Sequence, residues 1–177
     1  MSAYLGTKML KYEQGNVLSY FDKSKVIVIP HICNNIGGWG SGFVLSLSKK
    51  WPQHLKLLSP EYRYRTWYRN GFEEYSGPFG LGQIQICVPQ KNVHVINMIA
   101  QNGVKTNNDK PIKYEALVYC MRQVQRYIDS LNASSTSSTQ VEIQCPKFGS
   151  GLAGGNWSFI EELINEILTV PVNIYTL

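Results

Sequence analysis

The chain has 177 residues, of which 16% are charged and 44% are apolar. A chain of this length usually folds as one domain, and this composition excludes global disorder. The net charge of +5 favours anionic partners such as phosphates, but the basic residues occur along the whole chain rather than in one tract. We therefore expect a single domain over residues 1–177.

The sequence shows no pattern typical of secretion or of a membrane span. The N-terminus has no apolar signal-peptide core, and no apolar run reaches the ~18 residues of a transmembrane helix. The four cysteines have no CxxC spacing and lie in apolar stretches, which favours buried free thiols over disulfides. We expect no metal site, no membrane contact and a cytoplasmic location, or a nuclear one in a eukaryote.

The predicted elements alternate between strands and helices. In chain order we expect strands over 10–13 and 26–31, a helix over 43–50, a partly helical segment over 54–70, and strands over 83–88 and 93–99 joined by the turn 89–92. After these come a polar loop over 105–113, a helix over 114–131, a polar surface connection over 132–139, a strand over 141–145, a helix over 157–168 and a strand over 172–177. This alternation predicts an α/β layered domain with a mixed sheet.

Most of the 15 glycines lie in three patches, over 37–42, 71–82 and 149–155. The first and third patches each follow a predicted strand and precede a predicted helix, where ligands bind in α/β sheets beside free helix N-termini. Because glycine has no Cβ, ligand oxygens can approach its backbone N–H group closely. The two loops predict one phosphate-bearing ligand between them, with tight strand–helix connections as the alternative. The second patch predicts a turn region.

The third patch does not match the common phosphate-binding motifs in full. It has no Lys-Ser/Thr after its glycines, so it is not a P-loop. Gly149, Gly151 and Gly154 satisfy GxGxxG, but no acidic residue of a second βαβ half follows about 20 positions later. Since a lone GxGxxG is a weak signal, the prediction depends on the pair of loops.

Several short motifs, in this order along the chain, resemble those of macrodomains, the ADP-ribose-binding α/β modules. The most specific is H-x-C-N-x-x-G-x-W-G-x-G over 31–42, and the other matching stretches are 15–18, 96–99, 114–117, 148–157 and 174–177. The resemblance is greatest to the small ADP-ribose-1''-phosphate phosphatase branch and extends to ADP-ribosyl-glutamate and DNA-ADP-ribose hydrolases. It implies a three-layer α/β/α sandwich around a central mixed β-sheet.

The resemblance also implies a ligand site. The loop over 34–42 would hold the distal ribose, with Asn34 bonding a hydroxyl, and the loop over 149–154 would wrap the diphosphate. Asn16 stands where the family usually has an acidic residue for the adenine amino group, and its carbonyl oxygen can still accept. Tyr175 faces either the adenine or the core, and Trp39 either covers the ribose or packs the loop. The implied ligand-binding residues are Asn16, Val17, Asn34, Gly40, Ser41, Gly42, Phe148, Gly149, Ser150, Gly151, Leu152, Ala153, Gly154 and Tyr175.

For catalysis the chain departs from part of the family. The hydrolases of glutamate- or DNA-linked ADP-ribose use a lysine near the end of the strand matching 96–101, where this chain has no lysine. Some also use an acidic residue where this chain has Ala153, so a lysine-dependent covalent mechanism is disfavoured. The resemblance implies instead that His31 and Asn34 are catalytic, with His31 protonating a leaving group or orienting a water. The alternative for His31 is a structural histidine at a strand end.

Four functions follow, in decreasing order of support. The first is hydrolysis of ADP-ribose-1''-phosphate to ADP-ribose and phosphate, without a cofactor. The second is removal of ADP-ribose from protein or nucleic acid, and the third is a reader that binds ADP-ribose without turnover. The fourth is an RNA-binding domain that uses the aromatic and arginine residues over 62–69, which otherwise form a solvated helix. His54 and His94 are expected to be structural.

Overall fold

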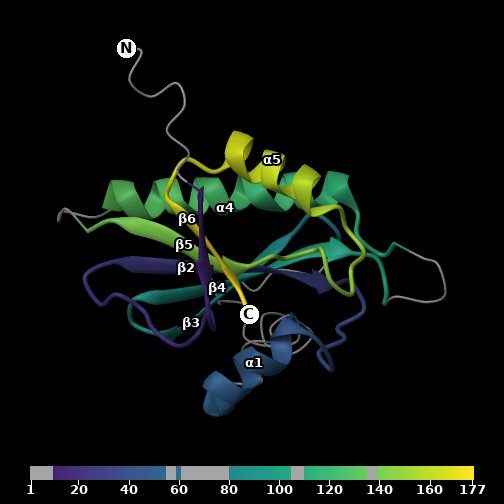
Figure 1. The fold of residues 1–177 in the computed structure, drawn as a ribbon, viewed down its shortest axis with the longest axis horizontal. Helices are drawn as coiled ribbons and strands as arrows, with labels where there is room; N and C mark the ends of the chain where they lie inside the picture. Colours follow the sequence, from purple (N-terminus) through teal and green to yellow (C-terminus); the bar gives the residue numbers. More distant parts are fainter. Residues whose placement is uncertain (1–9, 55–58, 61–79, 105–109, 135–138) are drawn as a thin grey trace.

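The computed structural model describes residues 10–54, 59–60, 80–104, 110–134 and 139–177. Its centre is a six-stranded sheet in the order β1-β6-β5-β2-β4-β3 (Figure 1). Neighbouring strands are parallel except β3 and β4, which are antiparallel, so the predicted mixed sheet is confirmed. The strands are β1 (Leu10–Gln14), β2 (Val26–Asn34), β3 (Ile84–Gln90), β4 (Val93–Gln101), β5 (Val141–Pro146) and β6 (Val172–Thr176).

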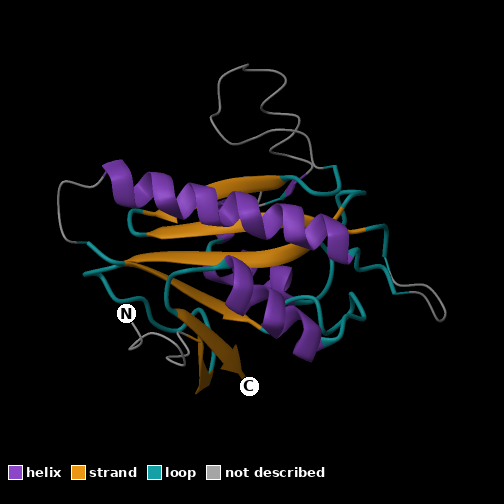
Figure 2. Cartoon of the chain, turned by 90° about the horizontal axis from the view of Figure 1, so that it is seen from above, coloured by secondary structure: helices purple, strands orange, loops and turns teal. Residues whose placement is uncertain are grey.

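Helices cover both faces of this sheet. They are α1 (Phe43–Lys50), α4 (Tyr114–Ser134) and α5 (Trp157–Ile167), with a short 3-10 turn, η1 (Pro52–His54), after α1. Figure 1 shows α4 and α5 on one face and α1 on the other, and Figure 2 shows α4 and α5 from above, lying over the strands. The predicted three-layer α/β/α sandwich is therefore confirmed. No helix in the described part of the chain is long and apolar enough to cross a membrane.

The central strand β2 separates two hydrophobic cores. Successive side chains of a strand point to opposite faces, so Val28 packs in the core beneath α4 and α5, while Ile27 and Ile29 pack in the core beneath α1. Coverage on both faces explains why β2 is a continuous apolar run rather than an alternating one. His31 and Cys33 continue the series of Ile27 and Ile29, so both are directed to the α1 side.

Several predicted boundaries are corrected by the structure, and β3 continues to Gln90, into the predicted turn 89–92. β2 continues to Asn34 and β4 to Gln101, because the two strands stay paired beyond the end of their apolar runs. The His-x-Cys-Asn part of the first motif therefore lies on a strand and not in a loop. α4 continues to Ser134, into the predicted surface connection, because no Gly or Pro interrupts the helix before that point.

Some predictions fall outside the described residues. These are the segment 55–70 apart from residues 59–60, most of the second glycine patch, residues 105–109 of the predicted polar loop and residues 135–138 of the connection. Within the rest of the polar loop, Ile112 is buried and forms a β-bridge with Gln101. All four cysteines are buried and free, which confirms the prediction of buried thiols.

Candidate functional site

A pocket of about 560 Å³ lies at the carboxyl ends of β2 and β5. These strands are parallel neighbours, and the chain leaves β2 toward α1 on one face and β5 toward α5 on the other (Figure 1). In open α/β sheets, ligands bind where the connections diverge in this way. The volume is also within the range of small-molecule sites.

The two glycine loops form opposite walls of this pocket. A Cβ on Gly42 would lie 3.5 Å from Cδ1 of Leu152, so the loops are in contact although they are far apart in sequence. The predicted site residues that line the pocket are His31, Asn34, Gly40, Ser41, Gly42, Phe148, Gly149, Gly151, Leu152 and Ala153.

The shape of the second loop depends on its glycines. Gly149 has φ +81°, and a Cβ there would lie 2.8 Å from Cδ1 of Ile32. A Cβ on Gly155 would lie 2.5 Å from the Gly149 carbonyl oxygen, to which the Gly155 N–H group donates at 2.7 Å. A Cβ on Gly151, in contrast, would meet no atom within 4 Å. The loop is therefore closed tightly at its base and open at Gly151.

Backbone N–H groups are the main polar feature of the pocket. Those of residues 149–153 donate to no acceptor in the described part of the chain. Across the pocket, α1 begins after Gly42 with no side-chain cap and no acidic residue in its first turn. Unpaired N–H groups in a glycine loop and at a helix N-terminus bind anions. The lining contains no Asp or Glu among the described residues, and Lys147 is its one lysine.

The side chain of Asn34 holds the first loop in shape. Its Oδ1 accepts from the N–H groups of Ile36 at 3.2 Å and Gly38 at 2.8 Å, and its Nδ2 donates to the Gly38 carbonyl at 3.1 Å. A Cβ on Gly38 would lie 2.9 Å from Nδ2, which explains the glycine at that position. Both lone pairs of Oδ1 are used, and one hydrogen of Nδ2 has no acceptor in the described part of the chain.

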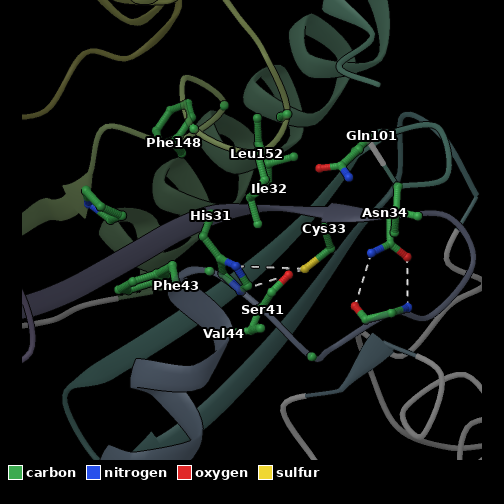
Figure 3. Close-up of a pocket in the computed structure, with 18 of the residues that line it drawn as sticks. His31, Ile32, Cys33, Asn34, Ser41, Phe43, Val44, Gln101, Phe148 and Leu152 are labelled. Atoms are coloured by element: carbon green, nitrogen blue, oxygen red, sulfur yellow. Dashed lines mark hydrogen bonds between the residues drawn. The ribbon is translucent and has the colours of Figure 1, made fainter. Parts of the chain in front are cut away.

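His31 is buried on the α1 side of the pocket and is 2% exposed. Its Nε2 lies 2.6 Å from Oδ1 of Asn97. An amide oxygen only accepts, so Nε2 carries the hydrogen and Nδ1 is the acceptor of a neutral ring. Burial lowers the pKa of His31 to about 4, so the ring is neutral at pH 7. The Phe43 ring lies edge-on to the imidazole, with the ring centres 5.6 Å apart, and Figure 3 shows the imidazole directed toward Cys33.

Cys33 is a neutral thiol beside this histidine. Its Sγ lies 3.8 Å from Nδ1 of His31, and burial raises the pKa of the thiol well above its ordinary value. A thiolate, which is the nucleophilic and metal-binding form, is therefore disfavoured. Among the described residues, no group of three or more His, Cys, Asp or Glu side chains is placed to hold a metal ion.

Comparison with known proteins identifies the family. No protein-family model matches the chain. A solved macrodomain structure from Streptomyces coelicolor is 34% identical to it, with a TM-score of 0.68 over 95% of this chain and 99% of that one. The chain is a macrodomain. A solved structure of a protein of unknown function from Bacteroides thetaiotaomicron is 35% identical, with a TM-score of 0.74 over 95% of the macrodomain and 98% of that chain.

A curated protein is also similar to the macrodomain along its whole length. The ADP-ribose 1''-phosphate phosphatase of Debaryomyces hansenii is 22% identical over 179 residues, which cover 94% of this chain and 98% of that one. The family resemblance predicted from the motifs is confirmed by these similarities. The roles of the individual site residues are not tested by them and stay predictions.

Five predicted site residues do not line the pocket of the macrodomain. Asn16 is exposed, and its Oδ1 accepts from the Leu18 N–H group at 2.9 Å. Val17 and Tyr175 pack in the core beneath α1. Tyr175 is half-buried there, so its side chain contacts the core. Ser150 donates its hydroxyl hydrogen to the Lys147 carbonyl at 2.9 Å, and the Gly154 N–H group helps to close the loop.

The structure gives hydrogen-bond partners to Trp39 and His94. Nε1 of Trp39 donates to the Ser48 hydroxyl at 2.9 Å, so this indole packs the first loop against α1. The Nδ1 atom of His94 is hydrogen-bonded to the Tyr127 hydroxyl between β4 and α4, as expected of a structural histidine. The side chain of His54 lies outside the described residues.

Two polar residues of the macrodomain pocket were missed by sequence reasoning. Gln101 ends β4 in register with Asn34 and is half-buried. Lys147 directly follows β5 and is exposed, and its Nζ lies 5.7 Å from the ring centre of Tyr12 and 5.9 Å from that of Trp157. The signal that could have found both is their position, because the carboxyl ends of parallel strands meet at one edge of a sheet. The other lining residues that were missed are Ile32, Cys33, Gly38, Phe43, Val44, Val104 and Pro146.

Proposed function

We propose that this macrodomain binds ADP-ribose and hydrolyses ADP-ribose 1''-phosphate to ADP-ribose and phosphate. The observation that carries the proposal is the run of N–H groups over residues 149–153 that find no acceptor among the described residues, opposite the uncapped N-terminus of α1. A ligand with a diphosphate and a terminal phosphate matches two such anion sites in one pocket. The relative from Debaryomyces hansenii, a named ADP-ribose 1''-phosphate phosphatase, supports the same ligand.

Each part of the pocket has a role in this proposal. The loop over 149–154 binds the diphosphate, and Asn34 donates its remaining amide hydrogen to a hydroxyl of the distal ribose. The N-terminus of α1, reached past Gly40, Ser41 and Gly42, binds the terminal phosphate. Donors that are already in place stabilise the charge that develops on phosphoryl oxygens during transfer.

His31 has a narrower role than the sequence predicts. Its ring is neutral, and its one hydrogen is directed to Asn97. It therefore has no free hydrogen for a leaving group at neutral pH. Of the two catalytic modes that the sequence predicts, the structure favours indirect support of a water over protonation of the leaving group.

The proposal is tested by calorimetry with ADP-ribose and by phosphate release from ADP-ribose 1''-phosphate. We expect binding at micromolar affinity or tighter, together with release of phosphate. Gly151→Glu is expected to abolish binding, because a carboxylate would enter the open part of the anion-binding loop. Gly151→Gln, which has the same length without the charge, is expected to bind more tightly than Gly151→Glu. Absence of binding to the unmodified protein would overturn the proposal.

A non-catalytic reader of ADP-ribose is the second candidate function. It is favoured by the absence of any Asp or Glu among the described lining residues and by the burial of His31. These observations leave the pocket without a side chain that titrates freely near pH 7. Binding of ADP-ribose without phosphate release under the same conditions would identify the reader.

A further inference from the structure

Hydrolysis of a phosphate ester requires a water molecule held in line with the bond that breaks. Of the residues that the sequence singles out, Asn34 has an Oδ1 that already accepts two backbone hydrogens. Nδ1 of His31 is an acceptor, but the ring is 2% exposed and lies beside Cys33 and Asn97. A more exposed polar group of the pocket is better placed to hold the attacking water.

Gln101 has an amide with free hydrogen-bonding capacity at this place. It ends β4 beside Asn34, with which it is in register, and it lines the pocket. Its Nε2 donates to the Gly103 carbonyl at 2.9 Å, while its Oε1 accepts from no donor in the described part of the chain. Figure 3 shows the side chain reaching in from the end of β4, with its oxygen turned toward Leu152. The second Nε2 hydrogen has no acceptor among the described residues either.

The orientation of this amide is fixed by a small network. The Gly103 N–H group donates to Oδ1 of Asn35 at 2.8 Å, and the Asn35 N–H group donates to the Gln101 carbonyl at 3.0 Å. Nδ2 of Asn35 donates in turn to Oδ1 of Asn102 at 3.0 Å. A functional side chain that is held by such a network is already in its working orientation, so no free energy is needed to order it at each turnover. Gln101 is therefore preorganised with its oxygen available.

We propose that Gln101 positions the attacking water, an inference that rests on the phosphatase function proposed above. Its Oε1 accepts one hydrogen of the water, and the unused Nε2 hydrogen donates to a phosphoryl oxygen. The water oxygen forms a bond to phosphorus, and the bond between phosphorus and O1'' breaks. The water loses one proton to solvent or phosphate, and O1'' gains one, which yields ADP-ribose and inorganic phosphate. Gln101 is itself unchanged and donates no proton.

The inference is tested by kinetics of three variants with ADP-ribose 1''-phosphate. Gln101→Met keeps the length of the side chain but removes the amide, and we expect kcat to fall about 100-fold with little change in KM. ADP-ribose affinity, measured by calorimetry, is expected to stay close to that of the unmodified protein. Asn35→Ala loosens the supporting network but leaves the Gln101 amide. Val88→Ala changes an exposed apolar residue of β3 that does not line the pocket.

The outcomes separate this inference from the proposed function. We expect the loss of kcat in Gln101→Met to exceed that in Asn35→Ala, with Val88→Ala near the unmodified protein. If the unmodified protein releases phosphate and Gln101→Met does so at the same rate, the inference is overturned and the phosphatase function stands. An equal loss in Asn35→Ala and Gln101→Met would also overturn it, since loop geometry alone would then explain both. If the unmodified protein releases no phosphate, the proposed activity fails, and the inference fails with it.

Discussion

His31 and Asn97 form a buried polar pair beside the pocket, and each is 2% exposed. Burial of an imidazole disfavours its charged form, which is why the pKa of His31 falls to about 4. The folded state is therefore stabilised as long as the ring is neutral and hydrogen-bonded. Asn97 accepts the ring hydrogen and fixes which nitrogen carries it.

The pH dependence of stability follows from this shift. An unfolded histidine has a pKa of about 6.5, so below that pH the unfolded chain binds a proton that folded His31 does not bind until about pH 4. The neutral His31 ring therefore makes its full contribution to the free energy of unfolding above pH 6.5. As the pH falls from 6.5 to 4, this contribution is lost, and the free energy of unfolding decreases by roughly 3 kcal/mol over the whole window. Urea unfolding at several pH values within this window measures the effect.

His31→Gln is the matched variant for this measurement. Glutamine does not titrate, so the stability of the variant is expected to fall less steeply with acidification than that of the unmodified protein. His94, whose pKa is also lowered by burial, is present in both proteins and cancels in the difference. Parallel pH profiles of the two proteins would contradict the shift.

At this scale the sequence predicted where Asn34 lies but not what its side chain does. The motif over 31–42 placed Asn34 at the pocket edge, and the structure has it there. Its side chain is nevertheless bonded to Ile36 and Gly38 of its own loop. These bonds require the loop to turn back so that the N–H groups of Ile36 and Gly38 reach the Asn34 side chain, and a residue pattern does not specify that path of the backbone. Gln101 was missed because a polar residue after an apolar run predicts the end of a strand.

Among the elements, the loop over 149–155 has the strictest steric limits. A Cβ at Gly155 would lie 2.5 Å from a backbone oxygen, which has no rotamer to change, whereas a Cβ at Gly151 meets open space. We therefore predict that Gly155→Ala destabilises the fold by about 1–3 kcal/mol and weakens ligand binding, because the loop has to move. Gly151→Ala is expected to be near neutral in thermal unfolding. Equal melting temperatures for the two variants would contradict this account of the loop.

Sequence patterns predicted the type and order of the described elements and were less successful at their ends. The apolar run of β2 and the stripe of α4 were sufficient to place both elements. The last residues of β2 and β4 were not predicted, since they are held in the sheet by each other and not by hydrophobic burial alone. The two glycine loops were predicted to share one ligand, but the direct contact between Gly42 and Leu152 was not, because sequence gives no distance between two loops.

On the scale of the whole molecule, the pocket lies between the two hydrophobic cores. Its walls come from the connection to α1 on one face and from the connection to α5 on the other. A ligand that bridges the two loops therefore links parts of the fold that the chain joins only through the sheet. Binding to the folded state alone increases the free energy of unfolding by RT ln(1 + [L]/Kd).

This linkage gives a thermal prediction. With ADP-ribose at about 100 times its Kd, the stabilisation is about 2.7 kcal/mol, which corresponds to an increase in Tm of roughly 5–10 °C for a domain of this size. Differential scanning fluorimetry measures it, and Gly151→Glu is the control that is expected to show no increase. An equal increase in Tm with ribose 5-phosphate would show that the loop over 149–154 does not recognise the diphosphate of the ligand.

The position of Lys147 has a consequence for spectroscopy. Its ammonium lies over the ring of Trp157, whose Nε1 donates to the Tyr12 hydroxyl at 2.7 Å. A nearby cation alters the emission of an indole, and Lys147 is also the one lysine of the pocket lining in the described residues. A phosphate that draws this ammonium toward the pocket changes the surroundings of Trp157. We therefore expect ligand binding to change the intrinsic fluorescence of the protein, so that it can be followed without a label and without turnover.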